Sequence, residues 1–368
     1  AVSAGEMAAA EPVVRSLADM RPEIEIVLTT CCADGRAMAG RIRARCDAVR
    51  GIGWLPWDRG GAIRRWLSKL QPGLVVVVET EIWPGLFFAC RDLDIPLCII
   101  NGRIYREDVW RYRLARPFFR RVLGCASWIG AQSGAEVERF RAIGADPARI
   151  EVIGNPKYAF VPRAASGDSR ISALGGAGTL IIAGSTHEPE EAMILRAFIR
   201  LRHDFPEVRL LLAPRKVERS AGVSRLVTEA GLRPASWATW DGRAEWDVMI
   251  LDQLGWLAEV YGCGKVAVIG GTFMDHGGQN PIEAAAHGVP VLMGPSFRNF
   301  AEIAGDLEDA GGMLRLRDEG GLEDALRGLL GDPERASKIG AAARECVRAR
   351  QGIAQRYATA LLERMRVH

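Results

Sequence analysis

One stretch decides the fold of this chain: Gly270-Gly271-Thr272-Phe273-Met274-Asp275-His276-Gly277-Gly278-Gln279-Asn280-Pro281-Ile282-Glu283. An apolar run at 266–269 precedes it, an alanine-rich run at 284–288 is typical of a helix, and the apolar run at 289–293 predicts the next strand. A strand, a glycine-rich loop, a helix and a second strand in series form the repeating unit of a parallel α/β sheet.

The glycine-rich loop has two interpretations. Backbone amides at a helix start have no intrahelical partner, and glycines allow close approach, so the loop could hold a nucleotide phosphate. Alternatively it is a plain turn, with Asn280 as N-cap, Pro281 at the first helical position and Glu283 at the third, as in a capping box. These residues alone favour neither interpretation.

Similar units fill the rest of the chain. Strands are predicted in the first half at 24–30, 52–55, 74–79, 97–101, 128–131 and 150–153. After a break rich in Pro, Gly and Ala, a second set follows at 179–183, 209–213, 247–251, 266–269, 289–293 and 313–316. We therefore expect an α/β protein of two Rossmann-like, doubly wound domains, 1–160 and 179–368, joined by a linker at 161–178. The last helix is expected to cross back to the first domain.

Composition narrows the class of protein. The 368 residues suffice for about two domains, and a net charge of +3 gives no strong field for nucleic acid. The eight cysteines include no CxxC pair, which argues against a disulfide framework or a zinc site and fits a reducing cytoplasm. No apolar run approaches the roughly 20 residues that span a bilayer. Because the chain opens on a turn and a helix at 8–20, we expect a first strand, and any membrane anchor, upstream.

Open parallel sheets bind ligands beyond the carboxyl ends of their strands. In the first half, Glu6 is either a first-turn acid favoured by the helix dipole or a general base. Glu79 and Glu81 follow the most buried strand, as exposed loop acids or as a close pair in which one pKa is raised for proton transfer. Lys157 is either a linker residue or a partner for a phosphate across an interdomain cleft.

The second half offers a similar choice at each turn. Ser185 and Thr186 either cap a helix or bind phosphate, and His187 is a ligand or a satisfied polar residue. Arg215, after Pro214, suits a phosphate or a base edge, or is surface charge.

Aromatic residues and arginines are mixed between 103 and 121. The mixture suits an anionic lipid surface, or an ordinary amphipathic helix with solvated arginines. No RNA-binding motif accompanies it, so no nucleic-acid partner is expected. The residues assigned to an acceptor or membrane surface are Arg103, Trp110, Arg111, Arg113, Arg116, Phe118, Phe119 and Arg120.

Five motifs follow one another along the chain: Ser-x-Gly-Glu (3–6), Glu-Thr-Glu-x-Trp-Pro (79–84), Ser-Thr-His-x-x-Glu-Glu (185–191), Pro-Arg (214–215) and Gly-Gly-x-Asn-Pro-x-Glu (277–283). Taken together, these motifs and their order resemble the Kdo transferases of lipopolysaccharide synthesis in Gram-negative bacteria. Leu-Pro-Trp-Asp (55–58) and Ala-Gln-Ser (131–133) are softer matches. The resemblance covers nearly the whole chain.

The resemblance implies a GT-B glycosyltransferase that moves 3-deoxy-D-manno-oct-2-ulosonic acid (Kdo) from CMP-Kdo to a lipid A precursor, lipid IVA. It implies inversion of the anomeric centre, no cofactor and no metal, at the cytoplasmic face of the inner membrane. Glu6 would be the general base, and Glu79 and Lys157 would stabilise the transition state. The first domain would bind the acceptor and the second CMP-Kdo. The donor-binding residues implied are Ser185, Thr186, Pro214, Arg215, Leu254, Gly255, Trp256, Asn280, Pro281, Ile282 and Glu283.

Two alternatives stay open. The chain departs from the family where Trp256 stands in place of a common acid and where residues 29–35 and 104–108 replace the usual turns. Another GT-B nucleotide-sugar transferase or epimerase is therefore the nearest rival, and a non-catalytic membrane-associated relative is the other. Glu6 and Glu79 at the acceptor side favour group transfer over the first alternative. The intact set Glu6, Lys157, Arg215 and Glu283 argues against the second.

Overall fold

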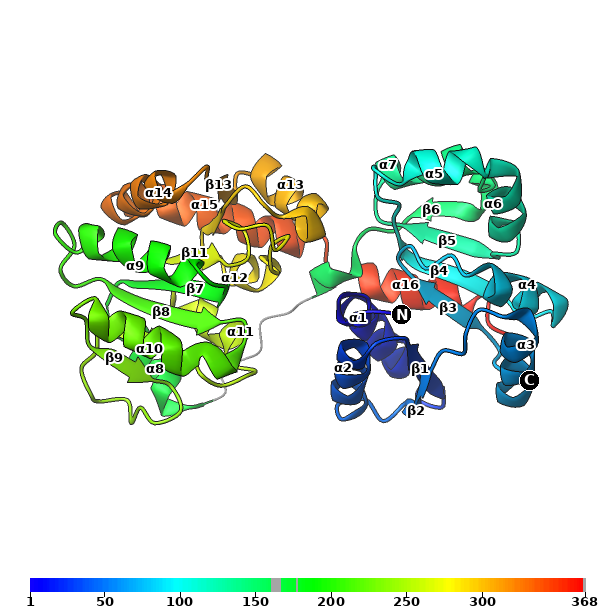
Figure 1. Ribbon diagram of the computed structural model, residues 1–368, viewed down its shortest axis with the longest axis horizontal. Coiled ribbons are helices and arrows are strands. Elements are labelled where there is room, and N and C mark those ends of the chain that lie inside the picture. The colour runs from blue at the N-terminus through cyan, green and yellow to red at the C-terminus, as the bar shows by residue number, and fades with distance from the viewer. Residues whose placement is uncertain (160–166, 177, 367–368) are drawn as a thin grey trace. The chain divides into compact units, whose positions relative to one another are not determined.

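The computed structural model describes residues 1–159, 167–176 and 178–366. The chain divides into two compact units, one comprising Ala1–Ala159 and Arg350–His368 and the other Phe160–Ala349 (Figure 1). Both are α/β with parallel sheets. The predicted linker is not wholly irregular, because it contains helix α8 (Ser169–Gly175), whose N-cap Asp168 accepts a hydrogen bond from the Arg170 amide. Residues 161–166 and 177 of that linker lie outside the described residues.

The described strands of the first unit form two parallel sheets. One pairs β1 (Ile26–Thr30) with β2 (Val49–Trp54). The other has the order β3 (Val75–Val78), β4 (Leu97–Gly102), β5 (Trp128–Ala131) and β6 (Ile150–Val152). The single doubly wound sheet expected from the sequence is therefore divided between β1 and β3, which do not pair.

The first helix of this unit precedes β1, the following ones lie between the strands along the chain, and the last one comes from the other end of the chain. They are α1 (Ala4–Met20), α2 (Ala33–Arg43), α3 (Gly60–Leu70), α4 (Pro84–Asp92), α5 (Val109–Leu114), α6 (Arg116–Leu123), α7 (Gly134–Ile143) and α16 (Ile353–Leu362). Helix α1 starts at Ala4, four residues before the predicted start at Ala8. The reason is a capping box between Ser3 and Glu6.

Tyr357 fixes the C-terminal helix α16 to the larger sheet of the first unit. Its hydroxyl is buried, accepts from the Asn101 amide at 3.2 Å, and lies 3.1 Å from the Gly130 carbonyl and 2.9 Å from the Gly154 carbonyl. Gly130 is required here, because a Cβ at that position would lie 2.4 Å from the tyrosine ring. The last helix therefore crosses back to the first unit, as expected.

The second unit is built on one parallel sheet of seven described strands, in the order β13, β12, β11, β7, β8, β10, β9. Their bounds are β7 (Leu180–Thr186), β8 (Arg209–Pro214), β9 (Pro234–Ser236), β10 (Val248–Ile250), β11 (Val266–Ile269), β12 (Val291–Met293) and β13 (Met313–Arg315). Its remaining helices are α9 (Glu190–Leu201), α10 (Ser220–Glu229), α11 (Leu257–Val260), α12 (Ile282–Ala286), α13 (Ala301–Asp309), α14 (Glu319–Gly331) and α15 (Pro333–Arg348).

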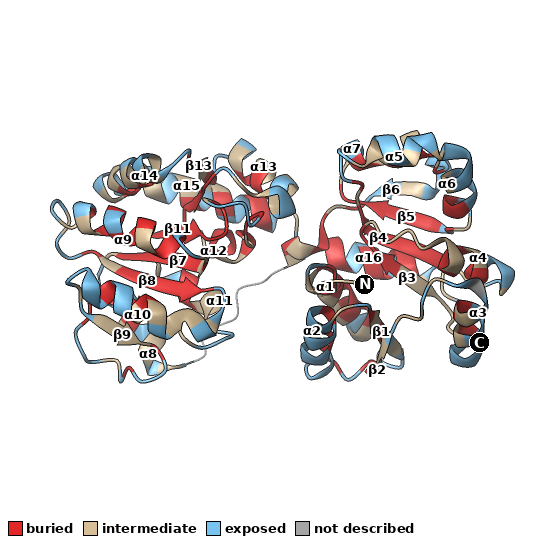
Figure 2. Ribbon diagram, in the orientation of Figure 1, coloured by how far each residue is buried: buried red, intermediate tan, exposed pale blue. Residues whose placement is uncertain are grey.

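The central strands of both units are fully buried, whereas the outer faces of the helices are exposed (Figure 2). Every residue of β4, β5, β10 and β11 is buried, as expected for parallel strands covered on both faces. Strand β9, which the sequence did not predict, is a three-residue edge strand that begins with Pro234, a residue confined to such positions in sheets.

Two negative findings concern only the described part of the chain. No helix there is long and apolar enough to cross a membrane. All eight cysteines lie in it, and all are free.

We expect Tyr357→Phe to lower the free energy of unfolding by about 1–3 kcal/mol, because the Asn101 amide and a buried carbonyl lose their partner. Tyr112→Phe, at a half-buried tyrosine of the same unit whose hydroxyl forms no hydrogen bond with any described residue, should change it by less than about 0.5 kcal/mol. Chemical denaturation measures both. Equal small effects would show that the buried hydroxyl does not hold α16.

Candidate active site

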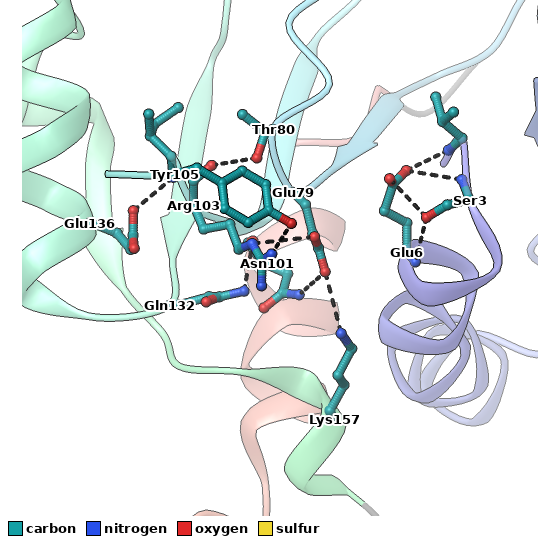
Figure 3. A network of polar contacts seen from close by, with 12 residues as sticks. Ser3, Glu6, Glu79, Thr80, Asn101, Arg103, Tyr105, Gln132, Glu136 and Lys157 are labelled. Atoms are coloured by element: carbon teal, nitrogen blue, oxygen red, sulfur yellow. Dashed lines mark hydrogen bonds and ion pairs between the residues drawn. The ribbon is translucent and has the colours of Figure 1, made fainter. Parts of the chain in front are cut away.

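A polar network surrounds Glu79 at the carboxyl end of β3. Glu79 has a left-handed backbone (φ 61°), and its side chain is 11% exposed. Its carboxylate accepts from Asn101 Nδ2 at 3.2 Å and lies 3.4 Å from Lys157 Nζ and 3.5 Å from Arg103 Nε (Figure 3). The structure therefore brings together Glu79 and Lys157, which are 78 positions apart in the sequence.

Two residues of this network come from the end of β4. Asn101 also has a left-handed backbone (φ 53°), and its buried Oδ1 has no hydrogen-bond partner among the described residues. Arg103, which the sequence grouped with the acceptor or membrane residues, is half-buried and lies on Glu79. A buried, unpaired acceptor beside an ion cluster is suited to a hydroxyl group of a ligand.

Glu81, in the turn after β3, is a carboxyl group whose pKa is raised by its surroundings. Burial raises the pKa of Glu81, the Trp83 indole that donates to it at 2.6 Å opposes the rise, and the nearby Glu6 and Glu79 carboxylates add to it. Burial is the main cause of the raised pKa, and the pairing of Glu79 with Glu81 for proton transfer stays a prediction. The sequence prediction did not include Glu81 among the site residues.

Asp58 explains the Leu-Pro-Trp-Asp stretch at 55–58. Its carboxylate accepts from the Gly85 and Leu86 amides, both at 2.9 Å, and so caps α4 from outside the helix. A Cβ at Gly85 would lie 2.5 Å from Asp58 Oδ1, so this approach requires glycine. The capped helix follows directly after Glu79-Thr80-Glu81 and fixes where that turn ends.

Glu6 is buried, and its carboxylate is turned back on its own helix. It accepts from Ser3 Oγ at 3.0 Å and from the Val2 amide, while the Glu6 amide donates to Ser3 Oγ at 3.3 Å. In Figure 3 the Glu6 carboxylate points back toward Ser3. Glu6 therefore caps α1 in this structure, and removing a proton from a substrate would require it to exchange a capping bond for that substrate.

The second unit places four turns side by side at the carboxyl edge of its sheet. They follow β11, β7, β8 and β10, which are neighbours in that order. The chain leaves β7 toward β8 on one side, and β11 lies on the other, so the topological switch point falls between β7 and β11. Ligands of open α/β sheets bind at such a point.

The predicted donor residues occupy these turns, but only some can offer a side chain. Arg215 is exposed and forms no ion pair with any described residue, and Leu254 and Gly255 are exposed as well. Pro214, Pro281 and Ile282 are buried, so they can contribute only backbone atoms. Thr186 is also fully buried, and its hydroxyl donates to Glu191 at 2.9 Å, so that hydroxyl is not free to bind phosphate.

The remaining donor residues are half-buried. Ser185 has a left-handed backbone (φ 57°). Asn280 Oδ1 accepts from the Ile282 amide at 3.1 Å, although the helix begins at Ile282, one residue later than the predicted Asn280 cap requires. Trp256 packs against Trp237, with ring centroids 5.6 Å apart, and the Arg170 guanidinium lies over both rings.

Glu283 is the most perturbed carboxyl group of this edge. Burial raises its pKa to about 7, and it forms no ion pair or hydrogen bond with any described residue. Burial raises the pKa of the Tyr261 hydroxyl, and the charge of Glu283 adds to the rise. A carboxyl group that has a pKa near 7 and no bonded partner is typical of a binding or catalytic position.

Sequence reasoning assigned no role to the two glutamates that end the 185–191 motif, which are buried. Glu190 and Glu191 are 0% and 1% exposed. Glu191 pairs with Arg219 at 2.7 Å, whereas Glu190 accepts only backbone hydrogen bonds, from the turns after β7 and β11. The available signal was two adjacent acids after a fully apolar strand.

The mixed basic and aromatic segment forms α5 and α6 on the first unit. Trp110, Leu114 and Phe118 are 58%, 78% and 44% exposed, while Phe119 is half-buried against Tyr112. The exposed arginines of the segment are Arg106, Arg111, Arg113, Arg116, Arg120 and Arg121.

No described residues form a group of three or more His, Cys, Asp or Glu side chains able to hold a metal ion. The absence of a cofactor or metal requirement stays a prediction.

The fold is shared with solved structures that contain a uridine nucleotide or nucleotide sugar. UDP-GlcNAc 2-epimerase from Neisseria meningitidis, solved with UDP-GlcNAc, matches with a TM-score of 0.59 at 13% identity, over 97% of each chain. An Anabaena protein solved with UDP matches with a TM-score of 0.60 at 14% identity, over 96% of each chain. The protein therefore has the GT-B fold, with the site residues at the carboxyl edges of its parallel sheets.

Sequence comparison identifies the family. Residues 1–160 match the model of the 3-deoxy-D-manno-octulosonic-acid transferases. The chain is 31% identical to the transferase of that name from Haemophilus influenzae, over 97% of this chain and 84% of the relative. It is 32% identical to the one from Bordetella pertussis, over 98% and 85%. The chain belongs to the Kdo transferase family of glycosyltransferases.

Proposed function

We propose that this protein transfers Kdo from CMP-Kdo to the lipid A precursor lipid IVA, with inversion and without a metal ion, at the cytoplasmic face of the inner membrane. Family membership supports Kdo transfer. The observation that carries the proposal is the network in which Glu79, Lys157 and Arg103 meet the unpaired Asn101 oxygen. That arrangement offers fixed charges and a hydroxyl-binding acceptor in one place.

In the proposed reaction an acceptor hydroxyl oxygen attacks the anomeric carbon of Kdo, and the bond from that carbon to the phosphate oxygen of CMP breaks. The hydroxyl proton passes to Glu6, and CMP leaves with the bonding electron pair. Inversion follows from a single displacement. Lys157, held against Glu79, and Arg215 are the cations that would stabilise developing negative charge.

The donor side belongs to the second unit. Arg215 would bind the phosphate, since its guanidinium is exposed and has no competing carboxylate among the described residues. Glu283 would accept hydrogen bonds from the ribose hydroxyls, which would give its unpartnered carboxyl group the partner it lacks in the protein alone. Leu254 and Gly255 line the same sheet edge and are accessible.

The membrane side of the proposal rests on α5 and α6. Their exposed Trp110, Leu114 and Phe118 lie among six exposed arginines. Aromatic and aliphatic side chains insert at the headgroup boundary, and arginines are attracted to anionic lipid. The acceptor is itself an anionic lipid, so this surface would bring the first unit to its substrate.

Glu6→Gln is the sharpest test of the base. Glutamine retains the capping box but cannot accept a proton, so we expect kcat for transfer of labelled Kdo to fall about 10²–10⁴-fold. The CMP dissociation constant should not change. Arg215→Ala should instead weaken CMP binding about 10–100-fold. Wild-type turnover by Glu6→Gln would exclude Glu6 as the base.

We expect CMP binding to tighten as pH rises through about 7, because Glu283 must lose its proton to accept from both ribose hydroxyls. The phosphate of CMP also titrates, near pH 6. The readout is therefore the ratio of the CMP dissociation constants of Glu283→Gln and wild type, measured by calorimetry from pH 6 to pH 8.5. The ratio should rise with pH. A ratio independent of pH would remove Glu283 from the pocket.

Replacing Trp110 and Leu114 together by Ser should weaken binding to phosphatidylglycerol-containing vesicles about tenfold or more, since two exposed apolar side chains are lost. Trp57→Ser is the control, because Trp57 is 88% exposed on the same unit but lies outside α5 and α6. Vesicle co-sedimentation compares the two. An equal loss in both variants would show that α5 and α6 are not the membrane surface.

A further inference from the structure

The glycine-rich turn after β11 already contains an anion. The carboxylate of Glu190, which is fully buried, accepts from the Gly271 amide at 2.7 Å and from the Thr272 and Phe273 amides, both at 3.0 Å. It also accepts from the His187 amide at 2.9 Å. One side chain of α9 thus joins the turns after β7 and β11, the two turns that flank the switch point.

No cation shares this carboxylate, because Glu190 forms no ion pair with any described residue. Four backbone amides directed at two carboxylate oxygens form a complete anion nest. The amides of residues 271–273 are therefore occupied before any ligand arrives. These three amides are not free for a donor phosphate. The sequence interpretation concerned the amides at the helix start near residue 280, and it stays a prediction.

The same contacts fix the rest of the loop. Gly271 is left-handed (φ 68°), and its carbonyl accepts from the Gly278 amide at 2.8 Å. Thr272 Oγ1 donates to the Ile269 carbonyl at 2.6 Å and accepts from the Gly294 amide at 2.8 Å. Residues 272–278 therefore form a loop whose two ends meet at Gly271 and Thr272, the residues whose amides donate to Glu190.

That segment carries the exposed His276. His276 stacks on His187, with ring centroids 4.3 Å apart and an interplanar angle of 20°, and Gln279 Nε2 lies 3.3 Å from His187 Nε2. One imidazole comes from the turn after β7 and the other from the turn after β11. Glu190 binds the backbone of both turns, so it sets the distance between the two rings.

We propose that Glu190 is the positioning residue of the donor site: its carboxylate takes the place of a bound anion, builds the loop from Gly271 to Gln279 and directs the donor's anionic groups away from residues 271–273. The role rests on the proposed function, since it assumes that the second unit binds a nucleotide-activated sugar. Glu190 acts through the loop and does not touch the substrate.

Glu190→Gln tests the role. The side-chain amide has nearly the same shape, but its NH₂ group faces backbone donors, so the loop must shift. We expect the KM for CMP-Kdo and the dissociation constant for CMP to rise about tenfold or more, with the KM for the lipid acceptor unchanged. A folded Glu190→Gln enzyme with both donor constants within twofold of wild type would overturn the proposal.

A spectroscopic readout separates loop positioning from simple loss of stability. The chain has five histidines, so the imidazole resonances can be assigned with single His variants. Glu190→Gln should move the His276 resonances. Glu191→Gln, at an equally buried neighbour that pairs with Arg219, should leave them in place. Movement in both variants, or in neither, would count against the role.

If Glu190→Gln does not fold, Gly271→Ala reaches the same amides from the loop side, because alanine is strained at a φ of 68°. It should raise the CMP dissociation constant and move the His276 resonances, and wild-type values would overturn the proposal. A wild-type protein that binds CMP but transfers no Kdo would contradict the proposed function. The CMP and His276 measurements would still decide the role of Glu190.

Discussion

The site depends on backbone conformation at the carboxyl ends of the parallel strands. Glu79 directly follows β3, and Asn101 and Ser185 are the next-to-last residues of β4 and β7. All three have positive φ although none is glycine. Such a conformation costs about 1–2 kcal/mol for a residue with a Cβ, and it persists where surrounding contacts enforce it. For Glu79 those contacts are Asn101, Lys157 and Arg103. The left-handed turn and the polar network therefore stabilise each other.

Buried carboxylates are held in three physically different ways. Glu79 relies on opposite charges, Glu190 on backbone amides alone, and Glu6 on the N-terminus of its own helix. Each way suits a different task. Backbone amides hold a carboxylate rigidly and do not transfer a proton to it. A cluster of cations stabilises negative charge that develops nearby. A carboxylate that caps a helix can leave the cap, because the first amides of the helix can bond to another partner.

The sequence predicted what local pattern determines. Apolar runs placed nearly all the strands, and motifs after the strands identified Glu79, Lys157 and Glu283. The pattern could not show that Thr186 and Ile282 are buried, since a hydroxyl bonded to Glu191 and one offered to a ligand have the same sequence. Nor could it divide the first sheet between β1 and β3, because pairing is a tertiary property. Glu190 was given no role because three of its four partners are backbone amides more than 80 residues away, which carry no side-chain signature.

The contact between Tyr357 and the sheet around Gly130 has a consequence for biosynthesis. The first unit is discontinuous in sequence, and all of the second unit is translated before α16. Domains usually fold from the N-terminus onward as the ribosome releases them. Here the second unit can complete its core while the first still waits for its closing helix, with the backbone groups of Asn101 and Gly154 uncovered. The half of the protein made first is thus the half finished last, and a nascent chain stalled before residue 350 would carry one folded unit and one open one.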